Sequence, residues 1–400
     1  MTDNAPITHA VTGFYRVFCP EKLQYVDAIV AYAASENLTK EEVMTELYND
    51  YIGCRYIQLE EQRAQGVSFP AQRSAAWFAQ RKRVRGSVTG SQPAGWFFDL
   101  GWKGTADDYK DNLAYIFHGK KKVFPPEAIA RMEHGNLYEE TALHRFLEWS
   151  VQNGRDMYVH ETGFRRNTTY KYLGASPDGL VSEIMYGLVV GVGKDDPAAS
   201  ILVRYFDDDG EIQEVEVCGK EKVSVCLAKG QTDNAKKKMN TLDEQELFKS
   251  RNFQPISEKY NKTQDLMYAG VVIHGVLEIK CPQKMYSSVP EYYIPQMHME
   301  MHTHNVRHAY FVVWQCNKNV ERTRVWKVRF NDGYWEDFIN VVQQFRSPRG
   351  DNEFGTAWNT FYRTFTTFKT DFKGNNKFMK SFITPYFEKR KFSYTKPWEV

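Results

Sequence analysis

Apolar residues recur every three or four positions through much of residues 1–70, which is the spacing of one face of a helix. The stretch Lys22–Ala34 has this period. A further helix is predicted after Thr39, because Thr39 and Glu42 have the spacing of an N-terminal capping box. Gly66–Pro70 resembles a linker. The pattern therefore predicts a helical N-terminal region over residues 1–70.

Helical and strand-like patterns alternate from residue 71 to about residue 345. Helices have the 3–4 residue period, and strands have a period close to two with Gly and Pro at their turns. The predicted helices are Glu127–Trp149, Pro290–Asn305 and Asp332–Phe345, and the predicted strands lie within Met157–Val190 and at Val271–Lys280, His308–Gln315 and Thr323–Arg329. Strands with helices between them predict an α/β or α+β fold for residues 71–345.

A long insertion, at about residues 183–270, separates the two halves of this core. Two strand-like pieces, Ile201–Phe206 and Glu214–Val225, flank the acidic turn Asp207–Gly210, which suits a hairpin. The following segment, Gly230–Asn261, is polar and charged, so we expect a flexible excursion.

The C-terminal extension, residues 346–400, mixes aromatic with basic residues between Phe354 and Trp398. Such a composition can stack single-stranded bases in a basic groove, or it can form an amphipathic helix packed on the core. We favour core packing over DNA contact.

The composition, with 42% hydrophobic and 26% charged residues, is that of a globular protein and excludes a largely disordered chain. The net charge of +2 indicates no class of partner. Six scattered cysteines without a C-x-x-C pair predict reduced thiols and no local zinc or iron–sulfur site. With no secretory signal and no membrane-spanning apolar run, we expect an intracellular protein. There is no P-loop motif and no esterase signature.

The candidate chemistry lies near the end of the predicted strand 271–280. In V-L-E-I-K-C-P (276–282), Glu278 and Lys280 point to one face, because side chains alternate along a strand. Asp178 lies in the turn G-A-S-P-D-G-L (174–180). Carboxylates are hard ligands that can hold Mg²⁺ against a scissile phosphate, and a lysine can orient the attacking water. An exposed Glu–Lys strand edge is the alternative for this pair taken alone.

Further motifs surround this pair in a definite order. W-F-A-Q-R (77–81) precedes G-S-V-T-G-S (86–91), G-N-L-Y-E-E-T-A (135–142) comes next, and Y-I-P-Q-M-H (293–298) follows the E-x-K strand. With these motifs in this order, the sequence resembles the phage-lambda-type exonucleases, the viral recombinase and alkaline-nuclease branch of the PD-(D/E)XK nucleases. The resemblance covers roughly Trp77 to Trp314.

The resemblance implies a restriction-endonuclease-like core, with a central mixed β-sheet flanked by helices. It implies a metal-dependent deoxyribonuclease, and first of all a 5′-to-3′ exonuclease that acts on double-stranded DNA ends and leaves single strands for recombination or viral genome processing. The implied cofactor is Mg²⁺, two ions with Mn²⁺ as a substitute, and a single-strand annealing protein is an implied partner. A trimeric ring and a monomer both remain open, and a viral protein would work in the host nucleus or at a cytoplasmic replication site.

The resemblance also implies roles for single residues. Three carboxylates would hold the metal ions, those of Asp178, Glu278 and Glu139. Lys280 would position the nucleophilic water, and Gln296 would contact this lysine or the scissile region.

A 5′-phosphate site is implied near the first motif, with Arg81, Ser91 and Thr89 as ligands. An arginine fork, hydroxyls and backbone amides in a Gly-containing turn are all suitable donors to a phosphate. This chain has additional basic residues after Arg81, so Arg83 or Arg85 could be the ligand instead. The gap between Asp178 and Glu278 is also much longer than is usual in the family.

Two other functions were weighed. An endonuclease acting on branched or single-stranded DNA would use the same residues, and a catalytically inactive DNA-binding recombination accessory protein would have no chemical reason to keep all of them. Four histidines, at 298, 302, 304 and 308, resemble a metal cluster, but no single helix face collects them. We expect contacts with the DNA backbone or solvent for them instead of a zinc site.

Overall fold

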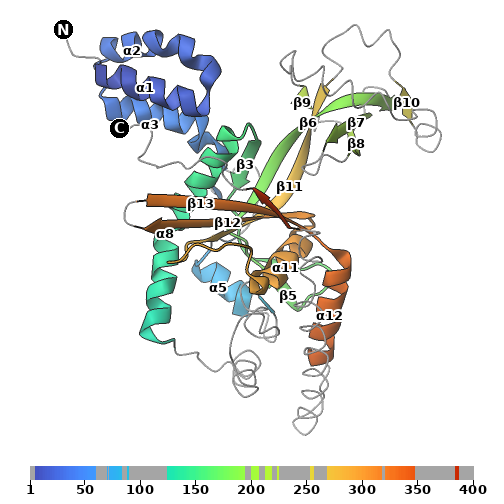
Figure 1. The fold of residues 1–400 in the computed structure, drawn as a ribbon. Helices are drawn as coiled ribbons and strands as arrows, with labels where there is room; N and C mark the ends of the chain where they lie inside the picture. Colours follow the sequence, from blue (N-terminus) through green and yellow to red (C-terminus); the bar gives the residue numbers. More distant parts are fainter. Residues whose placement is uncertain are drawn as a thin grey trace. The chain divides into compact units, whose positions relative to one another are not determined.

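The computed structural model describes residues 5–59, 70, 72–82, 88–89, 124–193, 200–206, 212–218, 223–224, 253–255, 268–317, 320–346 and 383–386 (Figure 1). The chain divides into two compact units. The first comprises Met1–Gly154, Tyr158–Val181 and His274–Val400, and the second comprises Arg155–Met157 and Ser182–Ile273. No helix among these described residues is long and apolar enough to cross a membrane.

The N-terminal region of the first unit is helical, as predicted. Its elements are α1 (Ala5–Phe18), the 3-10 helix η1 (Pro20–Tyr25), α2 (Val26–Ser35), α3 (Lys40–Tyr51) and the 3-10 helix η2 (Gly53–Arg55). The predicted capping box is confirmed, since Glu42 N donates to Thr39 Oγ1 at 3.2 Å and Thr39 N donates to Glu42 Oε2 at 2.8 Å. The apolar period over 22–34 is shared by η1 and α2, not by one helix.

The core of the first unit is a mixed β-sheet. Its strand order is β1 (Tyr56–Ile57), β3 (Asp156–His160), β6 (Gly179–Gly193), β11 (Tyr268–Lys280), β12 (His308–Asn317), β13 (Val320–Arg329) and β14 (Ile383–Tyr386). β11 and β12 are parallel, which requires a crossover, and η6 (Glu291–Tyr293) with α11 (Ile294–His304) supplies it. β12 and β13 are antiparallel neighbours. The predicted mixed α/β fold, with a central mixed sheet flanked by helices, is confirmed.

Helices cover both faces of this sheet because its central strands are apolar on both sides. On one face Phe311 and its neighbours pack into a core with α11 and with α12 (Asp332–Arg346). On the other face α8 (Pro126–Gln152) packs against β12 (Figure 1). Phe146 of α8 lies beside Tyr310 there. Arg145 anchors α8 to β13 through Glu321, with 2.7 Å between Nε and Oε2.

The strands of a small second sheet alternate in sequence with those of the main sheet. Its order is β2 (Val88–Thr89), β5 (Leu173–Ala175) and β4 (Arg165–Arg166), and the short helix α5 (Ala75–Lys82) precedes it. Thr89 pairs with Gly174 in the parallel register of β2 and β5. The linker predicted at 66–70 lies outside the described residues, except for residue 70.

The second unit contains the outer parts of β6 and β11 with four short strands. β7 (Ser200–Phe206) and β8 (Ile212–Cys218) are antiparallel, so the predicted hairpin is confirmed, although its acidic turn lies outside the described residues. β9 (Val223–Ser224) pairs with β11, and β10 (Phe253–Pro255) pairs with β6. The predicted excursion over 230–261 is therefore not irregular throughout, and the rest of it lies outside the described residues.

The aromatic and basic C-terminal stretch, 354–398, is described only at β14. This segment is a strand that pairs with β13, with Pro385 opposite Trp326. The aromatic and basic residues that suggested an amphipathic helix, between 354 and 377, lie outside the described residues, so core packing and DNA contact both stay predictions for them.

Candidate active site

The charged pair of the E-x-K motif lies at the C-terminal end of β11, on the sheet face that α11 covers. Glu278 and Lys280 share this face with Val276, since alternate side chains of a strand point the same way. Lys280 Nζ forms an ion pair with Glu278 Oε1 and also donates to Ile279 O at 3.1 Å. The side chain of Glu278 is 2% exposed and that of Lys280 is 24% exposed. The pair is thus a largely buried feature and not an exposed strand edge.

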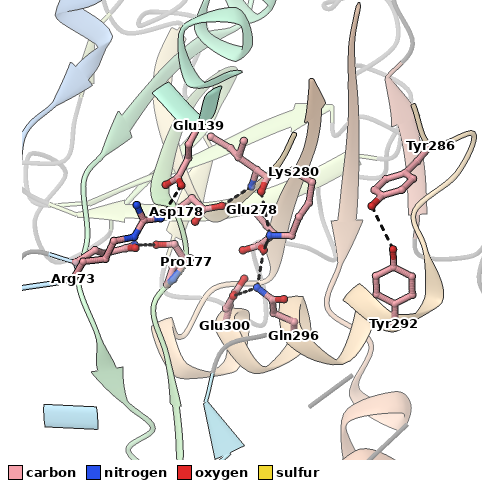
Figure 2. Close-up of polar contacts among 12 residues, drawn as sticks. Arg73, Glu139, Pro177, Asp178, Glu278, Lys280, Tyr286, Tyr292, Gln296 and Glu300 are labelled. Atoms are coloured by element: carbon pink, nitrogen blue, oxygen red, sulfur yellow. Dashed lines mark hydrogen bonds and ion pairs between the residues drawn. The ribbon is translucent and has the colours of Figure 1, made fainter. Parts of the chain in front are cut away.

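Asp178 reaches the same place from the turn before β6. Its backbone N donates to Leu277 O at 3.0 Å, and its Oδ2 accepts from Ile279 N at 2.6 Å (Figure 2). The Asp178 carboxylate therefore continues the pairing of β6 with β11 and is fixed next to the E-x-K residues. The following residue, Gly179, lets β6 lie close to β3, because a Cβ there would lie 2.7 Å from Val159 Cγ1.

Residues just before and within α5 hold the turn that carries Asp178. Gln72 Nε2 donates to Pro177 O at 2.7 Å, and Trp77 Nε1 donates to Ser176 Oγ at 3.2 Å. These two contacts connect the region of the W-x-x-x-R motif with the S-P-D-G motif, although the partners are 105 and 99 residues apart in the sequence.

Gln296 reaches the pair from α11, and it contacts Glu278 and not Lys280, the partner that the resemblance implied. Its Nε2 donates to Glu278 Oε1 at 2.6 Å and to Glu300 Oε1 at 2.9 Å (Figure 2). Gln296 is 5% exposed and Glu300 is 0% exposed. Glu300 was missed in the sequence, although its i+4 spacing from Gln296 places the two on one helix face.

Glu139 lies on α8, close enough to Asp178 for their charges to interact. Its Oε2 accepts from Arg73 Nη2 at 3.1 Å, and the same Nη2 donates to Asn136 Oδ1 at 2.9 Å (Figure 2). Arg73 has a φ of 63°, a left-handed conformation that costs energy outside glycine. Arg73 stands four residues before Trp77, and no sequence pattern marked it.

The carboxyl groups of this site repel one another. Burial raises the pKa of Glu278 to about 7, against the opposing effect of Lys280, and Asp178 adds to the rise. Burial likewise raises the pKa of Asp178, of Glu139 and, far more strongly, of Glu300. Burial alone would lower the pKa of Lys280, but the Glu278 and Asp178 carboxylates outweigh it and keep the lysine charged.

The donor set suits a hard divalent cation, because it consists of carboxylates whose mutual repulsion a cation would relieve. Asp178, Glu278 and Glu139 would hold such an ion. In the described part of the chain, no three His, Cys, Asp or Glu side chains are grouped closely enough to hold a metal ion together. The chemistry of the residues fits the metal, and the three carboxylates would have to approach each other to share it.

The predicted 5′-phosphate ligands are less completely described. Arg81 lies in α5 and Thr89 in β2, but their side chains are outside the description, as are Ser91, Arg83 and Arg85 entirely. The backbone of Thr89 runs beside Gly174, four residues before Asp178. The role of these residues stays a prediction.

The expectation that the histidines contact DNA or solvent is wrong for the two most buried ones. His298 is 0% exposed and accepts from Asn331 N at 3.1 Å, and His304 is 7% exposed. His302 stacks on Trp335 with 4.4 Å between ring centroids. These side chains pack inside the protein because α11 contacts β12 and β5, and its rings also meet Tyr334 and Trp335 of α12.

Residues 76–307 match the family described as the YqaJ-like viral recombinase domain. Among solved structures, the chain is similar to an alkaline exonuclease, LHK-Exo, from Laribacter hongkongensis, with 14% identity, a TM-score of 0.32, and coverage of 76% of this chain and 98% of that one. It is also similar to LHK-Exo in complex with dAMP, with 15% identity, a TM-score of 0.31 and the same coverage. No curated protein sequence matches significantly. Because the family match spans more than half of its length, the chain belongs to the YqaJ-like viral recombinase domain family.

Proposed function

We propose that the protein is a metal-dependent deoxyribonuclease, and specifically a 5′-to-3′ exonuclease that degrades one strand of duplex DNA. The observation that carries the proposal is the convergence of Asp178, Glu278 and Lys280 at the end of β11. Membership of a viral recombinase family supports a nuclease that acts in recombination. The single strand that remains would be used by an annealing protein in recombination or viral genome processing.

The charged lysine has a definite part in this reaction. Because Glu278 and Asp178 keep the ammonium of Lys280 protonated, it can donate hydrogen bonds but cannot act as the base. It would orient the attacking water and offset the charge that develops on the phosphate. Asp178, Glu278 and Glu139 would hold Mg²⁺, or Mn²⁺ in its place, which supplies the Lewis acid and lowers the pKa of water.

A 5′-phosphate site near the W-F-A-Q-R motif would set the 5′-to-3′ direction of digestion. Arg81, with Thr89 and Ser91, would bind the 5′-phosphate of a duplex end. Gln72 and Trp77 support this arrangement, since they connect this segment directly to the turn of Asp178.

The test uses linear duplex DNA labelled at one end, with Mg²⁺ or EDTA, with 5′-phosphate or 5′-hydroxyl ends, and with a covalently closed circle. We expect Mg²⁺-dependent loss of the 5′-phosphorylated strand while the circle is spared. The Lys280→Ala variant should cleave at least about a hundredfold more slowly and still bind DNA. Lys284→Ala is the matched control, because Lys284 is exposed on the loop that follows.

Each other outcome changes the assignment. Cutting of the closed circle would identify an endonuclease, and DNA binding without any cutting would identify an accessory protein. A Lys280→Ala variant with near wild-type rate would remove this lysine from the mechanism.

A further inference from the structure

The amide of Gln296 lies between two buried carboxyl groups. One nitrogen, Nε2, donates to Glu278 Oε1 at 2.6 Å and to Glu300 Oε1 at 2.9 Å (Figure 2). The remaining oxygens of this pair, Gln296 Oε1 and Glu300 Oε2, are buried and have no hydrogen-bond partner among the described residues. The Glu300 carboxyl group is 0% exposed and forms no ion pair with another described residue, so it is costly to bury.

The two acceptors decide which way the amide of Gln296 points. A glutamine side chain has an N–H₂ end and a C=O end of nearly equal size, so its hydrogen-bond partners set its orientation. Oε1 of Glu300 can accept a hydrogen bond whether or not the group carries a proton. With Glu300 on one side and Glu278 on the other, only the N–H₂ end satisfies both.

The orientation of the amide matters for Glu278. Glu278 Oε1 receives two donors, Gln296 Nε2 and Lys280 Nζ, so this oxygen is held from two sides. Such outer contacts orient a metal-binding carboxylate and leave its other oxygen for the ion. A buried group that weakens the fold yet aligns its neighbours is what is expected beside a functional site.

We propose that Glu300 is a positioning residue, which fixes the Gln296 amide with its N–H₂ end toward Glu278 and thereby orients the Glu278 carboxylate. This inference rests on the proposed metal-dependent nuclease function of the same site. Glu300 acts through Gln296 and does not touch the substrate.

A double-mutant cycle tests this chain of contacts. Glu300→Met and Gln296→Met keep a similar side-chain length and remove the hydrogen bonds. Glu300→Gln keeps a carbonyl acceptor for the amide. Mn²⁺ affinity of the full chain is measured by the electron paramagnetic resonance of free Mn²⁺, and Mg²⁺-dependent cleavage of linear duplex DNA is measured beside it.

We expect Glu300→Met to weaken Mn²⁺ binding about 10–100-fold, the usual effect of losing an outer-shell partner. Glu300→Gln should stay within a few-fold of the wild type. In the Gln296→Met background, Glu300→Met should add almost nothing, because the residue through which it acts is gone. Met301→Leu, on the same buried helix, is the control for repacking and should leave the affinity unchanged.

Equal effects of Glu300→Met with and without Gln296, or no effect at all, would overturn the inference. If Glu300→Met does not fold, Glu300→Gln is used instead, and a tenfold loss of its Mn²⁺ affinity would overturn the inference. If Glu300→Met weakens Mn²⁺ binding only when Gln296 is present, but the wild type cuts no DNA, the nuclease proposal alone is refuted. If the wild type cuts DNA normally, but the effects of Glu300→Met and Gln296→Met on Mn²⁺ affinity are additive, the inference alone is refuted. A wild type that binds no Mn²⁺ overturns both.

Discussion

The buried carboxyl of Glu278 should make the stability of the metal-free protein fall as the pH rises. Its pKa is about 7 in the folded protein against 4.5 ordinarily, so the folded state holds this proton more tightly than the unfolded state. Its contribution to stability is fully present below pH 4.5 and is lost as the pH rises through 7. At about 1.4 kcal/mol for each pKa unit, the loss by pH 8 is about 3 kcal/mol.

The measurement is the free energy of unfolding in urea at pH 5, 6, 7 and 8 in EDTA, for the wild type and for Glu278→Gln. Glutamine cannot ionise, so the decline should be shallower by about 3 kcal/mol in the variant. Asp178 also has a raised pKa and contributes the same sign to both proteins. Glu278 helps to raise the pKa of Glu300, so Glu278→Gln removes that part of the decline as well and makes the difference larger. Glu133→Gln, at an exposed position on α8, is the control. Parallel pH dependences in the wild type and Glu278→Gln would refute the reasoning.

Two further changes probe the surroundings of the site. Arg73→Gln should alter the free energy of unfolding by less than about 1 kcal/mol, because Arg73 is 54% exposed. Since Arg73 lowers the pKa of Glu139, its loss should move the acidic limb of the cleavage pH–rate profile to higher pH, and an unmoved limb would contradict this role. Gly174→Ala should cost about 1–3 kcal/mol in urea unfolding, because its Cβ would lie 2.4 Å from Phe164 Cζ. In Gly135→Ala the new Cβ meets nothing within 4 Å, so this variant should instead stabilise α8 by about 0.5–1 kcal/mol. Equal effects of Gly174→Ala and Gly135→Ala would rule out the clash with Phe164 as the cause.

The sequence predicted those features that depend on local spacing. The two-residue spacing of Glu278 and Lys280 places them on one strand face in any strand. The Thr39 capping box depends on a three-residue spacing, and the sequence signal and the observed contacts agree there. The core strands were also evident, because β12 is a long apolar run buried on both faces.

The residues that were missed or misread depend on tertiary contacts. α11 is buried on nearly all sides, so its polar residues do not mark an exposed face. Glu300 and His298 look like helix-surface residues in the sequence because they are polar, but each is 0% exposed in the structure. Arg73 belongs to the site because it contacts Glu139, which is 66 residues away in the sequence. No local sequence pattern predicts such a contact.

The arrangement of the site explains why a cation should matter for the whole fold. Asp178 is fixed by backbone hydrogen bonds, and Glu278 is held by Lys280 and Gln296, so neither carboxylate can move far from the other. Burial raises the pKa of both groups, and the Asp178 charge adds to the rise at Glu278, so this repulsion is built into the pairing of β6 with β11. A divalent ion that binds only the folded protein would relieve it and would stabilise the fold by the free energy of its binding. In this reading the same carboxylates that weaken the metal-free core supply the affinity for the ion that the proposed reaction needs.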